Sequence, residues 1–454
     1  MKVLMFGWEF PPQISGGLGT ACYGLTQALV REDVDVLFVV PKLMGNEPDN
    51  GSRLLSASEV GIRQVVSTDS ADQPFTRFRH FMKEGSFTTF EIPSTLSTYN
   101  MAHLHEPVQH IEHWNYPLNV AETAVEKTTV VTQSISGALY DFKGGYGPQL
   151  IEEVFRYANV ASEIAIAEQF DIIHAHDWMT YPAAIAAKRL SSKPMVVHVH
   201  ATEFDRAGQQ GSEMVYTIER EGLDEADKIV AVSEWTKRIM VDRYDIDPDK
   251  IVVVHNGVIP EERTITETKQ NLGSHVVTFL GRITYQKGPE YFVEAAEKVL
   301  TLFPDVHFIM AGSGDFLPQI IEKVARMKLS SQFHFTGFLK KHEIDQVLAS
   351  TSVYVMPSVS EPFGITPLEA IQRNVPIIIS NQSGVSEVMH HALKVDFWDT
   401  EALSQAICSV LHYNSLSREL KRNAGKAIDL ITWEKAAQRL NNLYYELTSN
   451  IHPN

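Results

Sequence analysis

The feature that most constrains the fold is a repeated alternation of short apolar runs with amphipathic stretches. The first run, KVLMFGW at 2–8, leads through a glycine loop and a helical stretch to DVDVLFVV at 33–40. This order is typical of two parallel strands joined by a helix. Four similar runs follow between residues 170 and 258, and each is almost entirely apolar. Strands of this kind are buried on both faces, so the sequence predicts a doubly wound α/β sheet.

The alternation stops at 258–273, a polar stretch without helical or strand period, and then restarts. Five more apolar runs, beginning with HVVTFLGR, predict a second Rossmann-like sheet with its own core. We therefore expect one domain at 1–257, with an insertion at about 43–145, and a second at 258–436. A chain of 454 residues is long enough for two or three domains. Two such sheets facing each other leave a cleft at the carboxyl ends of their strands, where ligands bind.

Composition excludes several classes of protein. The net charge of −17 repels phosphate backbones and argues against a nucleic-acid partner. The two cysteines are far apart in sequence, which excludes a disulfide framework and favours a cytoplasmic location. No run approaches the roughly 18 apolar residues that a membrane-spanning helix needs. Glu9 and two prolines interrupt the first apolar run, so we expect no signal peptide.

Two cations follow the first strand of the second sheet directly. Arg282 and Lys287, in GRITYQKG, are predicted to lie at its carboxyl end, on the cleft side. A planar guanidinium and a mobile ammonium together suit a diphosphate. The alternative is that both are ordinary solvated loop charges. The adjacent glycines and the position after a strand favour phosphate binding.

The segment EPFGITPLE follows another predicted strand. Glu361 lies in the loop, outside any helix, where the cleft is expected. The amides of Gly364, Ile365 and Thr366 lie near a predicted helix start, which is an anion-binding arrangement. This segment therefore predicts a site for a sugar hydroxyl and a diphosphate.

The same segment contains TPLE, the pattern of a capping box. It predicts Thr366 as the N-cap, Pro367 as the first helical residue and Glu369 as the reciprocal partner. This reading gives the Glu369 carboxylate a structural role that requires no ligand.

Three further segments add candidates for the cleft. Gly16 and Gly17, in PPQISGGLG, let the backbone approach a ligand, although a tight strand-to-helix turn explains them equally well. Phe338 ends a predicted strand, where a nucleotide base could stack or bond to the backbone. His176 and His200 end two other strands and are candidate hydrogen-bond donors to a substrate.

A metal site is the alternative for these histidines. His174 and His198 alternate with them along the two strands, and Asp177 and Asp205 follow closely. Histidines near strand ends are more often hydrogen-bonding core residues, so we predict no metal.

Together, these motifs resemble those of the retaining GT-B glycosyltransferases of group 1, a GT4-like family that includes glycogen synthase-like and sucrose synthase-like enzymes. Glu361 and Glu369 match its E-x7-E motif, and Arg282 and Lys287 match its donor-phosphate pair. HNGV, AGSGD, FTGFL and GGLG follow in the family's order, so the resemblance spans nearly the whole chain.

The resemblance implies a role for each matching residue. His176 would lie beside the anomeric carbon, and Glu361 would hold the transferred sugar's hydroxyls. Arg282, Lys287, Gly17 and the amides after Gly364 would contact the diphosphate, and Glu369 would bind the ribose. It also implies that residues 437–454 form a helix returning to the first domain. The implied partners are a nucleotide-sugar donor and a carbohydrate acceptor, without a cofactor.

The predicted function is transfer of a sugar, with glucose favoured, to build an α-glucan such as glycogen. One departure is Ile14, which stands where bacterial starch and glycogen synthases carry a lysine two residues before the paired glycines. The alternative is a sucrose-type or glycoconjugate transferase that acts on lipopolysaccharide or exopolysaccharide. A phosphorylase would require a pyridoxal phosphate lysine, and a non-catalytic sensor would not need the full donor site.

Overall fold

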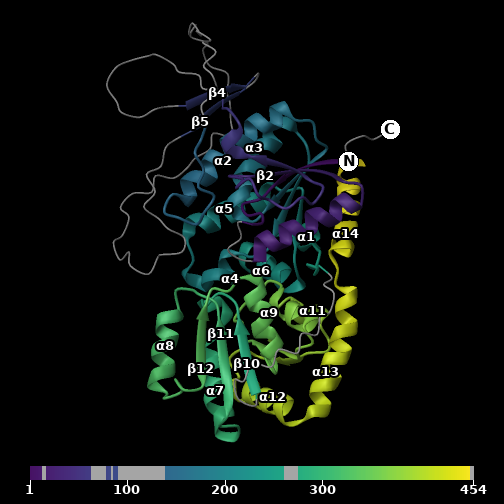
Figure 1. The fold of residues 1–454 in the computed structure, drawn as a ribbon. Helices are drawn as coiled ribbons and strands as arrows, with labels where there is room; N and C mark the ends of the chain where they lie inside the picture. Colours follow the sequence, from purple (N-terminus) through teal and green to yellow (C-terminus); the bar gives the residue numbers. More distant parts are fainter. Residues whose placement is uncertain (13–16, 63–77, 83–84, 90–138, 260–274, 450–454) are drawn as a thin grey trace, which may run out of the picture.

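The computed structural model describes residues 1–12, 17–62, 78–82, 85–89, 139–259 and 275–449. Its two main sheets are built from separate stretches of the chain (Figure 1). We use "N-terminal half" for the part that contains the first sheet and "C-terminal half" for the part that contains the second. All paired strands within both sheets are parallel. This is the predicted GT-B arrangement of two doubly wound α/β units.

The first sheet has seven strands in the order β3-β2-β1-β6-β7-β8-β9. Their bounds are β1 Lys2–Phe6, β2 Asp35–Val40, β3 Arg53–Ser56, β6 Ile172–His176, β7 Met195–Val199, β8 Lys228–Ala231 and β9 Ile251–Val253. The helices of this half are α1 Gly17–Arg31, α2 Leu150–Ala167, α3 Tyr181–Ser191, α4 Glu203–Ala207, α5 Glu213–Glu225 and α6 Glu234–Tyr244. Short 3-10 turns are η1 Ala57–Glu59, η3 Trp178–Thr180, η4 Gly208–Gln210 and η5 Pro248–Lys250.

The second sheet has six strands in the order β12-β11-β10-β13-β14-β15. Their bounds are β10 His275–Leu280, β11 Val306–Ala311, β12 Phe333–Gly337, β13 Val353–Met356, β14 Ile377–Ser380 and β15 Leu393–Val395. The helices of this half are α7 Pro289–Leu302, α8 Leu317–Arg326, α9 Lys341–Ser350, α10 Thr366–Gln372, α11 Val385–Val388, α12 Thr400–His412 and α13 Asn414–Ala427, with 3-10 turns η6 Tyr285–Lys287 and η7 Ile428–Leu430. The last helix is α14 Trp433–Ser449.

The insertion predicted at about 43–145 contains strand β3, the turn η1 and a separate antiparallel hairpin. The hairpin consists of β4 Phe78–Met82 and β5 Gly85–Thr89. Most of the remaining insertion, and nearly all of the predicted 258–273 linker, lies outside the described residues. No helix in the described ranges is long and apolar enough to cross a membrane.

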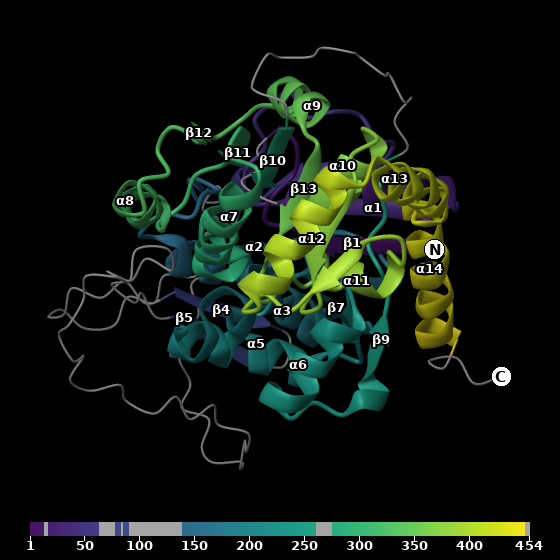
Figure 2. The same ribbon diagram turned by 90° about the horizontal axis from the view of Figure 1, so that it is seen from below.

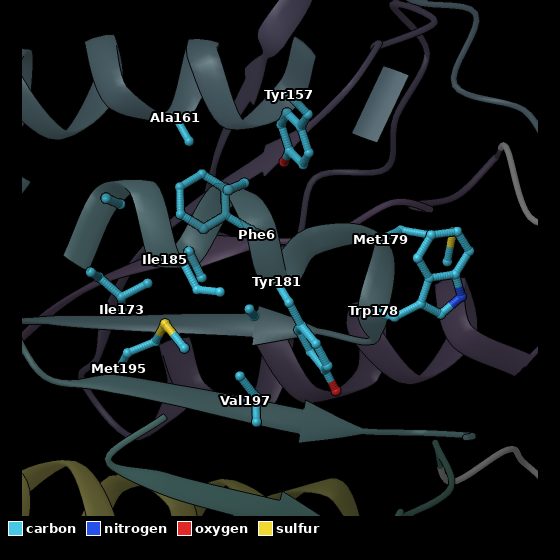
Figure 3. Packing of buried hydrophobic residues seen from close by; sticks show 14 of the residues in the cluster. Phe6, Tyr157, Ala161, Ile173, Trp178, Met179, Tyr181, Ile185, Met195 and Val197 are labelled. Carbon is cyan, nitrogen blue, oxygen red and sulfur yellow. The ribbon is translucent and has the colours of Figure 1, made fainter. Parts of the chain in front are cut away.

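Both faces of the first sheet are covered, as the apolar strands predicted. Leu4 and Phe6 of β1 face a core that includes residues of α2, α3 and α5, whereas Val3 and Met5 face the opposite side. Figure 3 shows part of the first core, where Phe6 and Tyr157 pack beside Ala161. The alternation of β1 residues between two cores explains why the strand has no polar face.

Helix α14 packs against α1, although the two helices are more than 400 residues apart (Figures 1 and 2). Gly24 of α1 makes this approach possible, because a Cβ atom there would lie 2.3 Å from Nε1 of Trp433. The chain therefore runs along the C-terminal half in α13 and ends against the N-terminal half. Val258, in the segment that leaves the N-terminal half after β9, forms a β-bridge with Thr432, just before α14. The two segments that connect the halves therefore lie side by side.

The order of the strands determines where a ligand can bind. In each sheet the chain order reverses at the first strand, between β1 and β6 and between β10 and β13. Open α/β sheets bind ligands at such a reversal, outside the carboxyl ends of the strands. At these carboxyl ends lie His176, the last residue of β6, and Gly17, the first residue of the helix that follows β1. Arg282 and Lys287 follow β10, and Glu361 follows β13.

Candidate active site

The structure brings Lys287 and Glu361 into direct contact. Lys287 ends the 3-10 turn after β10, and Glu361 lies in the loop after the neighbouring strand β13. Lys287 Nζ donates to Glu361 Oε2 at 2.5 Å, and Ser358 Oγ donates to the same oxygen at 3.0 Å. Glu361 is only 5% exposed. A nearly buried carboxylate paired with a half-buried cation is a polar contact point suited to a ligand that carries hydroxyls and phosphates.

The turn after Glu361 depends on a glycine. Gly364 has a φ of +99°, and a Cβ atom there would lie 3.2 Å from both Glu361 Cγ and Met356 Cε. A side chain would therefore be strained and would also press on Glu361. Within the described part of the chain, no protein oxygen accepts from the amides of Gly364, Ile365 and Thr366. These three donors are available at the start of α10.

The predicted capping box is wrong. Helix α10 begins at Thr366, so the N-cap position is Ile365, and it makes no side-chain capping bond. The Thr366 hydroxyl is instead 2.7 Å from the hydroxyl of Tyr354 on β13. A buried tyrosine needs a partner for its hydroxyl, and this requirement outweighs the local cap. Glu369 is half-buried on the first turn of α10 and is not the reciprocal partner of a capping box.

Arg282 and Phe338 lie at the carboxyl ends of β10 and β12 in the second sheet. Arg282 is half-buried and follows β10 by two residues. Phe338 follows Gly337, which has a φ of +71°, and its side chain is 70% exposed. An exposed aromatic ring at a strand end is available for stacking on a planar group. The two residues are separated by β11, since β12 pairs with β11 and β11 with β10.

Gly17 is exposed as the first residue of α1, and apart from its chain neighbours and its own helix no atom of the described residues lies within 4 Å of where its Cβ would be. This leaves space beside the backbone at Gly17, where the sequence predicts that a ligand approaches. Gly16 and Ile14 lie outside the described residues.

His176 is wholly buried at the end of β6 and pairs with His200 through Nδ1 and Nε2, 2.9 Å apart. His174 bridges two groups: Nδ1 is 2.7 Å from the Tyr444 hydroxyl of α14, and Nε2 is 3.3 Å from His198 Nδ1. Among the described residues, His176 Nε2 and His198 Nε2 are buried without a partner. The histidines thus form hydrogen-bonded pairs, and each pair has one buried nitrogen without a partner among the described residues.

The electrostatics of this cluster favour uncharged imidazoles. Burial lowers the pKa of His176 well below its usual value, and the neighbouring His174 and His200 act in the same direction. Burial likewise lowers the pKa of His174 to about 3. His176 is therefore neutral near pH 7 and can donate or accept one hydrogen bond through Nε2.

Among the described residues, three histidines of this cluster lie close enough together to be considered as metal ligands. One ligand atom from each of His174, His176 and His198 lies within 4.8 Å of the others. However, both nitrogens of His174 already have partners, which leaves only two unused nitrogens. A zinc site needs three or four ligands, so the geometry favours hydrogen bonding over metal binding.

The two aspartates considered as metal ligands have structural partners. Asp177, with a φ of +59°, accepts the His200 amide at 2.7 Å and the Ala201 amide at 3.3 Å. Burial raises the pKa of Asp177 to about 7. Asp205 closes a capping box with Thr202 at the start of α4 and also contacts Ser360 of the other half. Asp177 therefore holds the backbone of the β7 loop that carries His200.

The residues that join the two halves beside Glu361 are not among the candidates that the sequence motifs indicate. They are Ser233, Trp235 and His255 on the N-terminal side and Ser360, Pro362 and Glu387 on the C-terminal side. No local pattern identifies them, because each contact links residues more than 120 positions apart.

Two family models match adjacent parts of the chain. The model for glycosyl transferases group 1 matches residues 260–427, and the model for glycosyltransferase family 4 matches residues 126–262. Together they cover most of both sheets and include Arg282, Lys287, Glu361 and His176.

Full-length relatives agree with these models. An uncharacterized glycosyltransferase of Methanocaldococcus jannaschii is 25% identical, with 98% of each chain covered. The glycogen synthase of Mycobacterium tuberculosis is 21% identical over 98% of this chain and 94% of its own length. Among solved structures, Anabaena HepE in complex with UDP-glucose covers 98% of this chain and 100% of its own, with a TM-score of 0.63 and 15% identity.

Proposed function

Because the chain belongs to the group 1 (family 4) glycosyltransferases and has their GT-B fold, we propose that it transfers a sugar from a nucleotide-diphosphate sugar with retention of the α configuration. The favoured sugar is glucose, and the favoured acceptor is an α-glucan such as glycogen. The observation that carries this proposal is the 2.5 Å contact between Lys287 and Glu361 at the strand-order reversal of the second sheet.

The C-terminal half supplies the donor site in this proposal. The cations of Arg282 and Lys287 stabilise the diphosphate as negative charge develops on it, and the amides from Gly364 to Thr366 donate to its oxygens. Phe338 stacks on the base and Glu369 accepts from the ribose. Before the donor binds, Lys287 donates to Glu361. When the donor is bound, Lys287 also donates to the diphosphate, and Glu361 accepts hydrogen bonds from the sugar hydroxyls.

The N-terminal half supplies the reacting face. The neutral imidazole of His176 lies beside the anomeric carbon. Its Nε2, which has no partner among the described residues, forms a hydrogen bond with the sugar. Gly17 lets the first helix approach the diphosphate from the opposite side. The acceptor hydroxyl attacks from the face that the diphosphate leaves, and the departing phosphate takes its proton. This route retains the configuration and requires no cofactor or metal.

Comparisons support the choice of sugar and acceptor. The relative named glycogen synthase aligns over nearly all of both chains, and the similar HepE structure contains UDP-glucose. Ile14, in place of a lysine, gives no support to ADP-glucose as the donor. A sucrose-type or glycoconjugate acceptor is the alternative, and it would use the same donor site. We also propose a cytoplasmic location, since Cys22 and Cys408 are free.

Calorimetry against UDP, ADP and GDP, and against their glucose and mannose forms, tests the donor site. We expect one nucleoside diphosphate to bind at least about tenfold more tightly than the others, which corresponds to about 1.4 kcal/mol of binding free energy. The bare nucleoside serves as the control and is expected to bind weakly because it lacks the diphosphate. Absence of binding by every compound would contradict the proposed donor site.

A further inference from the structure

The loop that carries Glu361 is bonded to the N-terminal half on both sides of that residue. Before it, Ser360 Oγ donates to Asp205 Oδ1 and accepts from Trp235 Nε1 at 3.0 Å. After it, the Pro362 carbonyl accepts from Ser233 Oγ at 2.5 Å. Asp205, Ser233 and Glu361 are each no more than 5% exposed. The backbone of Glu361 is thus held between two buried contacts that cross from one half to the other.

A third contact joins the start of α6 to the C-terminal half. The carboxylate of Glu387 accepts from the amides of Glu234 at 2.9 Å and Trp235 at 2.7 Å. The same carboxylate lies 2.9 Å from His255 Nε2. An acid at a helix N-terminus satisfies open amides and interacts favourably with the helix dipole. Here that acid comes from the opposite half, so the helix start is completed only when the halves meet.

The contacts require close backbone approach at Gly384. A Cβ atom there would lie 2.2 Å from the Pro362 carbonyl oxygen and 2.5 Å from Ser233 Cβ. The Gly384 amide also donates to the Glu361 carbonyl at 2.9 Å, and the Glu361 amide donates to the Gln382 carbonyl at 2.9 Å. The segment before α11 therefore connects the Glu387 contact to the backbone of Glu361.

We propose that Ser233, Trp235, Ser360 and Glu387 form an interdomain latch that positions Glu361 for sugar transfer when the two halves engage. This inference rests on the proposed function of Glu361. The latch residues are positioning residues, because Ser233 contacts the loop backbone, Trp235 and Ser360 contact each other, Ser360 also contacts Asp205, and Glu387 contacts the start of α6. None of them is among the donor-binding residues.

The latch separates binding from transfer. Three of the proposed donor contacts lie in the C-terminal half. They are Phe338, which stacks on the base, and the cations Arg282 and Lys287, which bind the diphosphate. Of the proposed donor contacts, the backbone at Gly17 belongs to the N-terminal half. The C-terminal half can therefore bind the donor through the other contacts without the latch. Transfer also requires His176, which lies in the other half, at the correct distance from the sugar held by Glu361. Loss of the latch should therefore lower kcat and leave donor affinity nearly unchanged.

Two matched serine variants test this separation. Ser233 and Ser212 are both N-cap residues whose hydroxyls accept from the helix they precede, α6 and α5 respectively. Only Ser233 also donates across to Pro362. We expect Ser233→Ala to lower kcat by about 10- to 100-fold, because small misplacements of reacting groups have effects of that size. Ser212→Ala should change kcat by less than about threefold, because the hydrogen bonds of Ser212 go to Glu203, Val215 and Tyr216, all within the N-terminal half.

Trp235→Phe provides a conservative second variant if Ser233→Ala folds poorly. It removes the Nε1 donor to Ser360 and keeps an aromatic side chain. We expect its kcat to fall while its donor Kd, measured by calorimetry, stays within about twofold of wild type. Ser360→Thr, which keeps the hydroxyl, should recover more activity than Ser360→Ala. Unchanged kcat in Ser233→Ala and Trp235→Phe, or a fall in donor affinity as large as the fall in kcat, would overturn the latch.

Small-angle X-ray scattering tests the latch without relying on activity. The double variant Trp235→Phe, Glu387→Gln should have a larger radius of gyration than wild type, and Ser212→Ala should not. An identical radius for all three proteins would overturn the latch as a contact that holds the halves together. A wild-type protein that transfers no sugar would instead contradict the proposed function, and the scattering comparison would still test the latch.

Discussion

Replacing Glu361 with alanine is expected to abolish sugar transfer while leaving the fold intact. The carboxylate is the proposed acceptor for the transferred sugar's hydroxyls, and a preorganised polar contact of this kind contributes about 10²–10³-fold to kcat. The folded state should tolerate the loss, because the Lys287 side chain that it pairs with is 21% exposed and remains accessible to water. The measurement is the rate of nucleoside diphosphate release with acceptor present, together with the thermal midpoint.

Glu401→Ala is the matched control for Glu361→Ala. Glu401 also pairs with a lysine of the same half, Lys298, at 2.8 Å, but on the exposed surface between α7 and α12. Its removal should leave kcat within about twofold of wild type, since exposed ion pairs contribute little. Activity near that of wild type in Glu361→Ala would show that the central assignment is wrong.

The second large effect is expected from Lys287→Ala, which should weaken binding of the nucleotide sugar. A hydrogen bond to a charged group contributes about 1.5–3 kcal/mol, which corresponds to about 10- to 100-fold in Kd. The variant should also be less stable, because Glu361 would keep only Ser358 as a side-chain donor while its own side chain is 7% exposed. Calorimetric titration with the donor identified above measures the first effect, and the thermal midpoint measures the second.

Two comparisons separate phosphate recognition from general damage in Lys287→Ala. Lys298→Ala removes the cation of the surface pair and should leave donor affinity unchanged. The bare nucleoside should bind Lys287→Ala and wild type equally, since it carries no phosphate. Donor affinity equal to that of wild type would remove Lys287 from the phosphate site, even if the variant were less stable.

The positions of the strands along the chain could be predicted from the sequence for a simple physical reason. Residues buried on both faces of a parallel sheet must be apolar, so VVTFL and VYVM stand out in the printed sequence. Polar residues directly after such runs must lie at one edge of the sheet. This reasoning led to Lys287 and Glu361, which the structure joins in one ion pair.

The errors and omissions arise where tertiary contacts outweigh local pattern. The sequence around Thr366 fits a capping box. In the structure, however, the Thr366 hydroxyl forms a hydrogen bond with the hydroxyl of the buried Tyr354. The pairing of His174 with Tyr444 joins residues 270 positions apart, and the Glu387 contact to Trp235 joins residues 152 apart. No period or motif encodes such pairs, because they exist only after both sheets and the final helix have packed together.

The measurement that tests the central claim most directly is a proton NMR time course of the wild-type enzyme with its donor and an α-glucan oligosaccharide. The account predicts an extended oligosaccharide with a new α-linked anomeric signal, formed in step with nucleoside diphosphate. A new β-linked signal would contradict retention of configuration. Tight donor binding without any transfer or hydrolysis, with every acceptor class tried, would contradict the assignment of this chain as a working sugar transferase with Glu361 in its active site.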